Sequence, residues 1–115
     1  MDEFIEKREK PRVEVRWPIK VLTDDGKVDG ETLNISLDGI SISCDKPLVL
    51  NKIFILSIEP LGQSVLELRG KIVWSDSYDI EGGSTYAVGV SFVEISDEDR
   101  HRFNKFSELV SYLFR

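Results

Sequence analysis

Alternation of apolar and polar residues is the feature of this sequence that most constrains its fold. From residue 13 to residue 93, apolar side chains recur at every second position in several short runs. Successive side chains of a β-strand point to opposite faces, so a period of two is typical of strands that bury one face. The first run carries its apolar residues at Val13, Val15, Trp17, Ile19 and Val21. The sequence therefore predicts a fold built mainly from half-buried strands.

Turn signals divide the alternating region into short strands. Segments rich in Gly, Asp, Asn, Ser or Pro separate the runs, as is typical of turns. The predicted strands are residues 13–21, 28–35, 40–44, 53–58, 65–74 and 85–93. Strands this short and this closely spaced indicate an all-β barrel or sandwich.

The last segment of the chain changes period. Ser96 precedes three acidic residues, and this order is typical of a capped helix N-terminus, where acids also suit the helix dipole. Apolar residues then follow at helical spacing: Phe103, Phe106, Val110 and Leu113. A C-terminal helix over about residues 97–114 is expected to pack this stripe against the end of the barrel.

Length and composition fit one folded domain. The chain has 115 residues, 41% of them hydrophobic and 31% charged, which is ordinary for a globular protein. We expect residues 1–12 to form a flexible N-terminal arm and residues 13–115 a single domain. No apolar run approaches the roughly 20 residues of a membrane helix, and the charged N-terminus does not resemble a secretory signal. A cytoplasmic protein without membrane insertion is expected, and the single cysteine, Cys44, agrees with a reducing compartment.

The charge distribution favours a small anionic ligand. A net charge of −6 argues against a polymeric nucleic acid as partner, because such surfaces are usually basic. Basic residues nevertheless gather near the N-terminus: Lys7, Arg8, Lys10, Arg12, Arg16 and Lys20. A local basic patch on an acidic protein suits a small anion better than a polymer.

Two short motifs carry a family resemblance. Arg8 and Arg12 form R-x-x-x-R before the first strand, and Asn34, Ser36 and Gly39 form N-x-S-x-x-G between the second and third strands. In this order, within an all-β pattern, they resemble the binding signature of the PilZ domain family, R-x-x-x-R followed by [D/N]-x-S-x-x-G. The resemblance covers nearly the whole chain. It implies a six-stranded antiparallel β-barrel with a C-terminal α-helix.

The resemblance also implies a bacterial receptor for the second messenger cyclic di-GMP, with no cofactor and no metal. Arginine can hold a phosphate or the O6/N7 edge of guanine in bidentate fashion. The Asn34 carbonyl can accept from guanine N–H groups, and the Ser36 hydroxyl can donate to phosphate. Gly39 permits positive φ and close approach of the backbone to the ligand.

Two further candidates and one departure complete the resemblance. Lys7 resembles a position that influences whether one or two nucleotides bind, and its charge favours two. Trp74 could stack on guanine, although its alternation with Ile72 fits a core position, which is the favoured interpretation. Asn34 stands where many members have Asp, and this change removes a charge-assisted hydrogen bond. Binding is expected to persist with a weaker contact.

Other functions are open at this stage. The single His and Cys are far apart and no nucleophile motif is present, so an enzyme is not expected. The main alternative is a PilZ-like protein-interaction module that binds no nucleotide, in which Asn34, Ser36 and Gly39 only form a turn. A barrel that binds single-stranded nucleic acid is disfavoured by the acidic balance. In the favoured hypothesis the ligand orders the arm onto the barrel and signals to an unknown downstream partner, and the protein is a monomer or weak homodimer.

Overall fold

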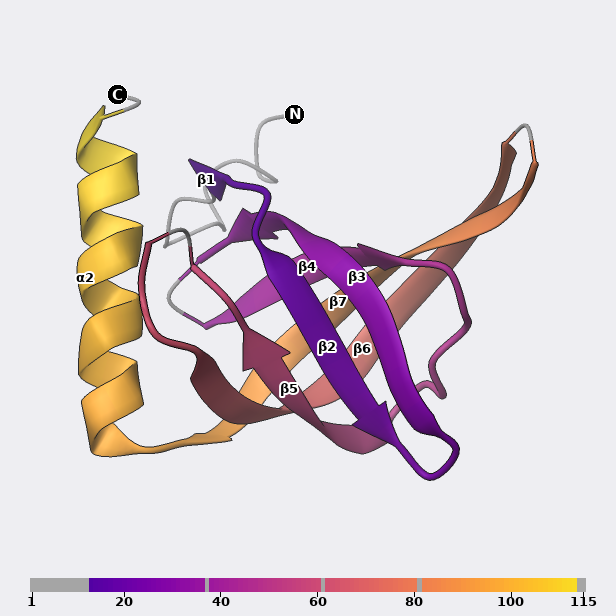
Figure 1. The fold of residues 1–115 in the computed structure, drawn as a ribbon, viewed down its shortest axis with the longest axis horizontal. Coiled ribbons are helices and arrows are strands. Elements are labelled where there is room, and N and C mark those ends of the chain that lie inside the picture. The colour runs from indigo at the N-terminus through magenta and orange to yellow at the C-terminus, as the bar shows by residue number, and fades with distance from the viewer. Residues whose placement is uncertain (1–12, 37, 61, 81, 114–115) are drawn as a thin grey trace, which may run out of the picture.

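The fold is a β-barrel followed by one helix. The computed structural model describes residues 13–36, 38–60, 62–80 and 82–113, and the side chains of residues 13, 80 and 106–113 are not considered. Its elements, drawn in Figure 1, are β1 (Val13–Glu14), β2 (Pro18–Thr23), β3 (Gly26–Ile35), β4 (Gly39–Cys44), β5 (Ile53–Ile58), β6 (Leu66–Ile80), β7 (Gly83–Ile95) and α2 (Asp97–Leu113).

Six strands close into an antiparallel barrel, as predicted. The order around the barrel is β3-β2-β5-β6-β7-β4, and β4 pairs back onto β3. Closure leaves these strands without a free edge, which removes the usual site of strand-to-strand aggregation. The short β1 pairs only with the last residues of β3, beyond the end of the β2 pairing.

The first predicted strand is interrupted, so the prediction of one strand over residues 13–21 is wrong. β1 ends at Glu14 and β2 begins at Pro18, where a residue without an N–H is tolerated at a strand start. The fully buried Thr32 bridges the gap. Its hydroxyl donates to the Val15 carbonyl and accepts the Trp17 N–H at 2.8 Å. One side chain thereby satisfies both backbone groups that the interruption leaves unpaired.

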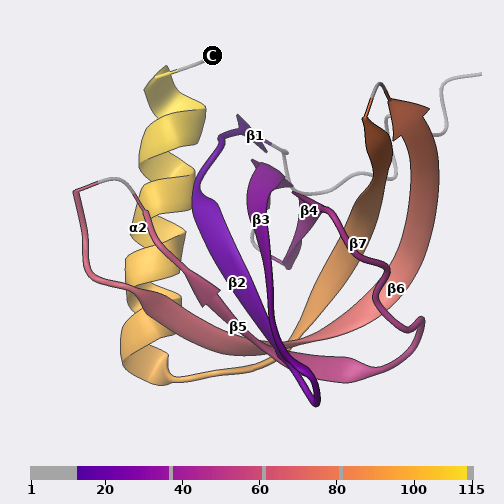
Figure 2. The same cartoon turned by 45° about the vertical axis from the view of Figure 1, so that its right-hand side comes forward.

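The hairpin of β6 and β7 is longer than predicted. The predicted strands 65–74 and 85–93 become Leu66–Ile80 and Gly83–Ile95, and the extra residues project from the barrel as a two-stranded ribbon (Figures 1 and 2). Described residues 75–79 of this ribbon are exposed, so no hydrophobic alternation marks them. The predicted turn is present, because Gly82 and Gly83 have φ of 96° and 147°.

The barrel interior holds the apolar face of each strand. On β4, Ile40, Ile42 and Cys44 are all buried on the inward face, as their alternation predicted. Burial raises the pKa of the Cys44 thiol, because desolvation disfavours the thiolate. This cysteine therefore acts as a small core residue rather than a reactive nucleophile.

Among the described side chains, Phe103 and a polar cluster attach helix α2 to the barrel. Ser96 caps the helix by accepting the Asp99 N–H at 3.1 Å, which confirms the predicted N-cap. Phe103 is fully buried and meets Phe92 edge to face, with ring centroids 5.0 Å apart. The side chains of Phe106, Val110 and Leu113 lie outside the described ones. No helix in the described part of the chain is long and apolar enough to cross a membrane.

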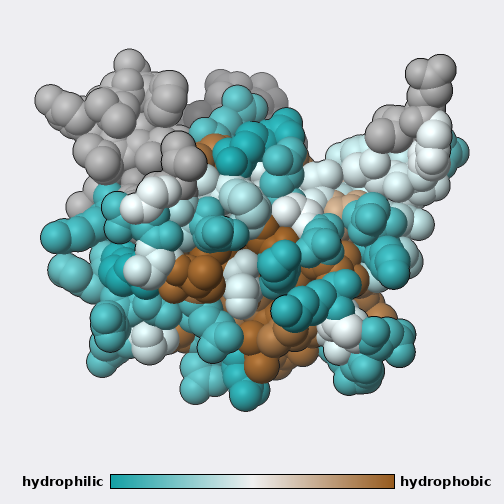
Figure 3. All heavy atoms as spheres, in the orientation of Figure 1, coloured by the Kyte–Doolittle hydropathy of each residue, from teal (hydrophilic) through white to brown (hydrophobic). Residues whose placement is uncertain are grey.

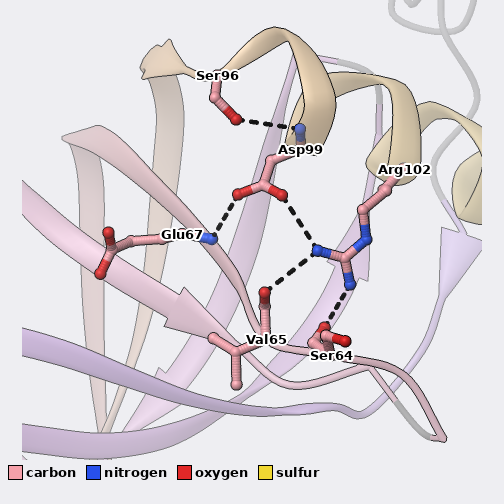
Figure 4. Close-up of polar contacts among 6 residues, drawn as sticks. All are labelled: Ser64, Val65, Glu67, Ser96, Asp99 and Arg102. Carbon is pink, nitrogen blue, oxygen red and sulfur yellow. Dashed lines mark hydrogen bonds and ion pairs between the residues drawn. The ribbon is translucent and has the colours of Figure 1, made fainter.

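The polar cluster joins the first turns of α2 to the start of β6 (Figure 4). The Asp99 carboxylate accepts the Glu67 N–H at 3.3 Å and pairs with Arg102 at 3.1 Å. Arg102 also donates to the carbonyl oxygens of Ser64 and Val65. The Asp99 and Arg102 side chains are only 20% and 25% exposed, so solvent screens this pair less than the other ion pairs of the described residues.

Candidate functional site

The pairing of β1 with β3 fixes where the basic arm joins the barrel. Val13 lies opposite Ile35, and Glu14 lies opposite Asn34. The R-x-x-x-R motif precedes Val13 in the sequence, and Val13 lies beside the end of β3 that carries Asn34. Lys7, Arg8 and Arg12 themselves lie outside the described residues.

A β-bulge turns Asn34 to the outer face of the barrel. Thr32 pairs with Ile42 and Asn34 pairs with Ser41, so Leu33 is an extra residue on β3. An extra residue reverses the alternation that follows it. Ile35 is therefore fully buried, whereas Asn34 is half-buried on the outside.

Ser36 stabilises the turn that follows β3. Its backbone N–H donates to the Gly39 carbonyl at 2.9 Å, and its hydroxyl lies 3.2 Å from the same oxygen. Donation from Ser36 to a phosphate therefore requires its hydroxyl hydrogen to leave this carbonyl. The turn role does not exclude the ligand role, because the Ser36 N–H still donates to the Gly39 carbonyl when the hydroxyl rotates away.

Glycine is required at position 39 for a different reason from the one expected. Its φ is not positive, so the expectation of a left-handed backbone is wrong. A Cβ at this position would lie 2.3 Å from the Val90 carbonyl oxygen. Glycine is needed here because β4 approaches the backbone of β7 too closely for any side chain.

Trp74 lies outside the barrel, so its interpretation as a core residue is wrong. Ile72 pairs with Val90 and Trp74 pairs with Gly89, which makes Val73 the extra residue of a second bulge. The bulge keeps Ile72 fully buried and leaves Trp74 43% exposed.

Gly89 supports the indole ring of Trp74. A Cβ on Gly89 would lie 2.0 Å from Nε1, 2.3 Å from Cε2 and 2.5 Å from Cδ1 of that ring. The indole therefore rests directly on the glycine backbone. Because the residue as a whole is 43% exposed, the ring remains open to stacking from solvent.

Residues from five strands line up across this outer face. The register places them in the order Glu14, Asn34, Ser41, Gly89 and Trp74, on β1, β3, β4, β7 and β6. Directly opposed Cα atoms in antiparallel strands are about 5 Å apart, so Asn34 and Trp74 are separated by about 15 Å. We call this row the outer-face row. It offers an amide, a hydroxyl and an aromatic ring beside the attachment of the basic arm.

Sequence reasoning missed three members of the outer-face row, Glu14, Ser41 and Gly89. The place of Ser41 and Gly89 beside Asn34 and Trp74 depends on the two bulges. The amide, hydroxyl and aromatic ring of the row suit a planar base, because amides and hydroxyls bind base edges and aromatic rings stack on base faces.

A separate groove lies on another part of the barrel. It has a volume of about 640 Å³ and is lined by residues 15–18, 59, 60 and 62–64. It contains none of the described members of the binding signature, and its Arg16 is paired with Glu31 at 2.6 Å. We regard the outer-face row as the better candidate, because it contains two predicted site residues, Asn34 and Trp74. Among the described residues, no cluster of His, Cys, Asp or Glu is placed to hold a metal.

The fold and this face together define a PilZ-type barrel. Its marks are the closed six-stranded barrel, the C-terminal helix and the N-x-S-x-x-G turn beside the first strand. The sequence model of the PilZ domain matches residues 6–110. The chain belongs to the PilZ domain family.

Solved structures share this fold at low sequence identity. The PilZ domain of YcgR from Escherichia coli, solved with c-di-GMP, has a TM-score of 0.78 at 13% identity and covers 95% of both chains. MotI/DgrA, the inhibitor of motility of Bacillus subtilis, gives 0.74 at 14%, covering 95% of this chain and 53% of its own. PlzA from Borreliella burgdorferi, in complex with c-di-GMP, gives 0.67 at 12%, covering 97% and 53%.

The chain thus spans about half the length of MotI/DgrA and PlzA. No curated protein matches it in sequence.

Proposed function

We propose that this PilZ domain is a receptor for cyclic di-GMP. The observation that carries the proposal is the register of β1, which places Val13, the residue that follows the R-x-x-x-R motif in the sequence, opposite Ile35, between Asn34 and Ser36. The two halves of the binding signature are 22 positions apart, counted from Arg12 to Asn34, and this pairing supports their meeting at one site. The YcgR domain and PlzA, which share the fold, were solved with this ligand.

In this proposal each part of the ligand meets a matching group. Arg8 and Arg12 hold phosphate and guanine O6/N7, as the fork of a guanidinium allows. Asn34 accepts from a guanine N–H and Ser36 meets a phosphate. Trp74 stacks on a guanine face, because its indole is exposed in the outer-face row. Lys7 adds charge next to the first arginine, which favours a second nucleotide.

Signalling follows from ordering of the arm, without chemistry. Basic residues of the arm repel one another, and ligand phosphates neutralise that repulsion. The ligand then holds the arm against the outer-face row and creates a surface, partly nucleotide, for a downstream partner. The ligand shifts this equilibrium only by its difference in affinity for the two states of the arm.

The test compares two arginines in isothermal titration with cyclic di-GMP. Arg12→Ala should lower affinity roughly ten- to a hundredfold, the loss of about 1.5–3 kcal/mol for hydrogen bonds to a charged group. Arg16→Ala is the matched control, because Arg16 lies four positions on and pairs with Glu31 away from the row. Equal affinities of Arg12→Ala and wild type would show that the site is misassigned.

A protein-interaction module without nucleotide is the second candidate, and one observation favours it. Apolar side chains are exposed on the adjacent strands β2 and β5, with Leu22 at 36% and Ile53 at 47%. Apolar residues also reach the surface among polar ones on the face shown in Figure 3. Exposed apolar patches are typical of interaction surfaces. If the protein shows no binding of cyclic di-GMP in isothermal titration, the protein-interaction module becomes the favoured function.

A further inference from the structure

We propose that the hydroxyl of Ser41 is a further ligand-binding group that reads a guanine base between Asn34 and Trp74. Ser41 belongs to neither half of the binding signature. The inference rests on the proposed function and names a further contact to the ligand within the same site.

The first observation is an unpaired buried hydroxyl. Ser41 is 3% exposed, and its Oγ has no hydrogen-bond partner among the described residues. Most buried polar groups in folded proteins are hydrogen-bonded, because an unpaired one lowers stability. Serine at this position therefore costs the free protein stability. A ligand that forms a hydrogen bond with the Ser41 hydroxyl would supply the missing partner.

The second observation is the place of Ser41 in the outer-face row. It pairs with Asn34 on one side and with Gly89 on the other. Gly89 has no side chain to screen the hydroxyl, and the Trp74 indole rests on that glycine. The Ser41 hydroxyl thus lies on the outer side of the sheet, between the Asn34 amide and the Trp74 indole. Because the hydroxyl is buried, contact with a base requires a neighbouring side chain, such as that of Asn34, to move aside.

Base chemistry makes this pair of groups complementary to guanine. Guanine presents O6, an acceptor, next to N1–H, a donor. Ser41 donating to O6 and the Asn34 carbonyl accepting from N1–H would pair both groups of guanine.

The test uses Ser41→Ala with Ser43→Ala as the matched control. Ser43 lies two residues on along the same strand and face, opposite Glu31 and Ala87. Ser41→Ala should lower affinity for cyclic di-GMP roughly three- to tenfold, the worth of one neutral hydrogen bond. The melting temperature of free Ser41→Ala should be unchanged or higher, because the orphan hydroxyl is gone. Ser43→Ala should leave the affinity unchanged.

Each contrary outcome has a distinct meaning. If wild type binds cyclic di-GMP and Ser41→Ala binds equally well, the inference is overturned and the proposed function stands. A clear fall in the melting temperature of free Ser41→Ala would also overturn it, because the hydroxyl would then have a structural partner. If wild type itself binds no cyclic di-GMP, the proposed function fails and the Ser41 contact fails with it.

Discussion

Replacing Gly89 by alanine should weaken ligand binding while leaving the barrel intact. The three atoms nearest to a Cβ at this position all belong to the Trp74 indole, at 2.0–2.5 Å. Real Cβ contacts are never this short, so the indole must leave the sheet. The backbone can accept alanine, because φ at Gly89 is not positive.

Gly89→Ala should change the affinity for the ligand much more than the free energy of unfolding. Base stacking on an aromatic side chain contributes about 1–3 kcal/mol, so loss of the Trp74 surface should lower affinity roughly five- to a hundredfold. Glycine within a strand is less stable than alanine by about 0.5–1 kcal/mol. This gain offsets the lost contact of the exposed indole, and the free energy of unfolding should change by less than about 1 kcal/mol.

The assay is a double-mutant cycle measured by isothermal titration with cyclic di-GMP. Gly89→Ala and Trp74→Ala act on the same ring, so the double variant should bind no more weakly than Trp74→Ala alone. Urea unfolding of each variant checks that the barrel is preserved. Additive losses of affinity would refute the reasoning, since they would mean that Gly89 affects binding independently of Trp74.

Three further changes test the fold that supports the site. Gly39→Ala should lower the free energy of unfolding by about 3 kcal/mol or more in urea titrations, because its Cβ would meet the Val90 carbonyl at 2.3 Å. Thr32→Val should cost about 2–4 kcal/mol in the same assay, because the Trp17 N–H loses its buried acceptor. Arg102→Met should cost about 1–2 kcal/mol and lower the melting temperature by several degrees, because α2 loses its hydrogen bonds to the Ser64 and Val65 carbonyls just before β6.

Elements with one buried face could be predicted from the sequence. The strand 53–58 and the helix start at Ser96 agree with the structure, because alternation and capping are local signals. The interruption before Pro18 could not be predicted, because it depends on the Thr32 hydroxyl from a different strand. The projecting ribbon was missed because its residues bury no face.

The candidate site was predictable only where a motif marks it. Asn34, Ser36 and Gly39 are recognisable from their spacing, and β1, which follows the arginine motif in the sequence, pairs with the end of β3 that carries Asn34. Trp74 was assigned to the core because a simple period of two places it with Ile72. The bulge at Val73 reverses that assignment. A bulge follows from pairing between distant strands, so local alternation cannot reveal it.

The most direct test of the central claim is isothermal titration of the wild-type protein with cyclic di-GMP, with GTP and cyclic di-AMP as controls. The account predicts saturable heat with cyclic di-GMP, at micromolar or tighter affinity, and much weaker binding of both controls. A fitted stoichiometry of two nucleotides per chain would agree with the charge of Lys7. No heat and no rise in melting temperature at high cyclic di-GMP concentration would contradict the account and favour a protein-interaction module.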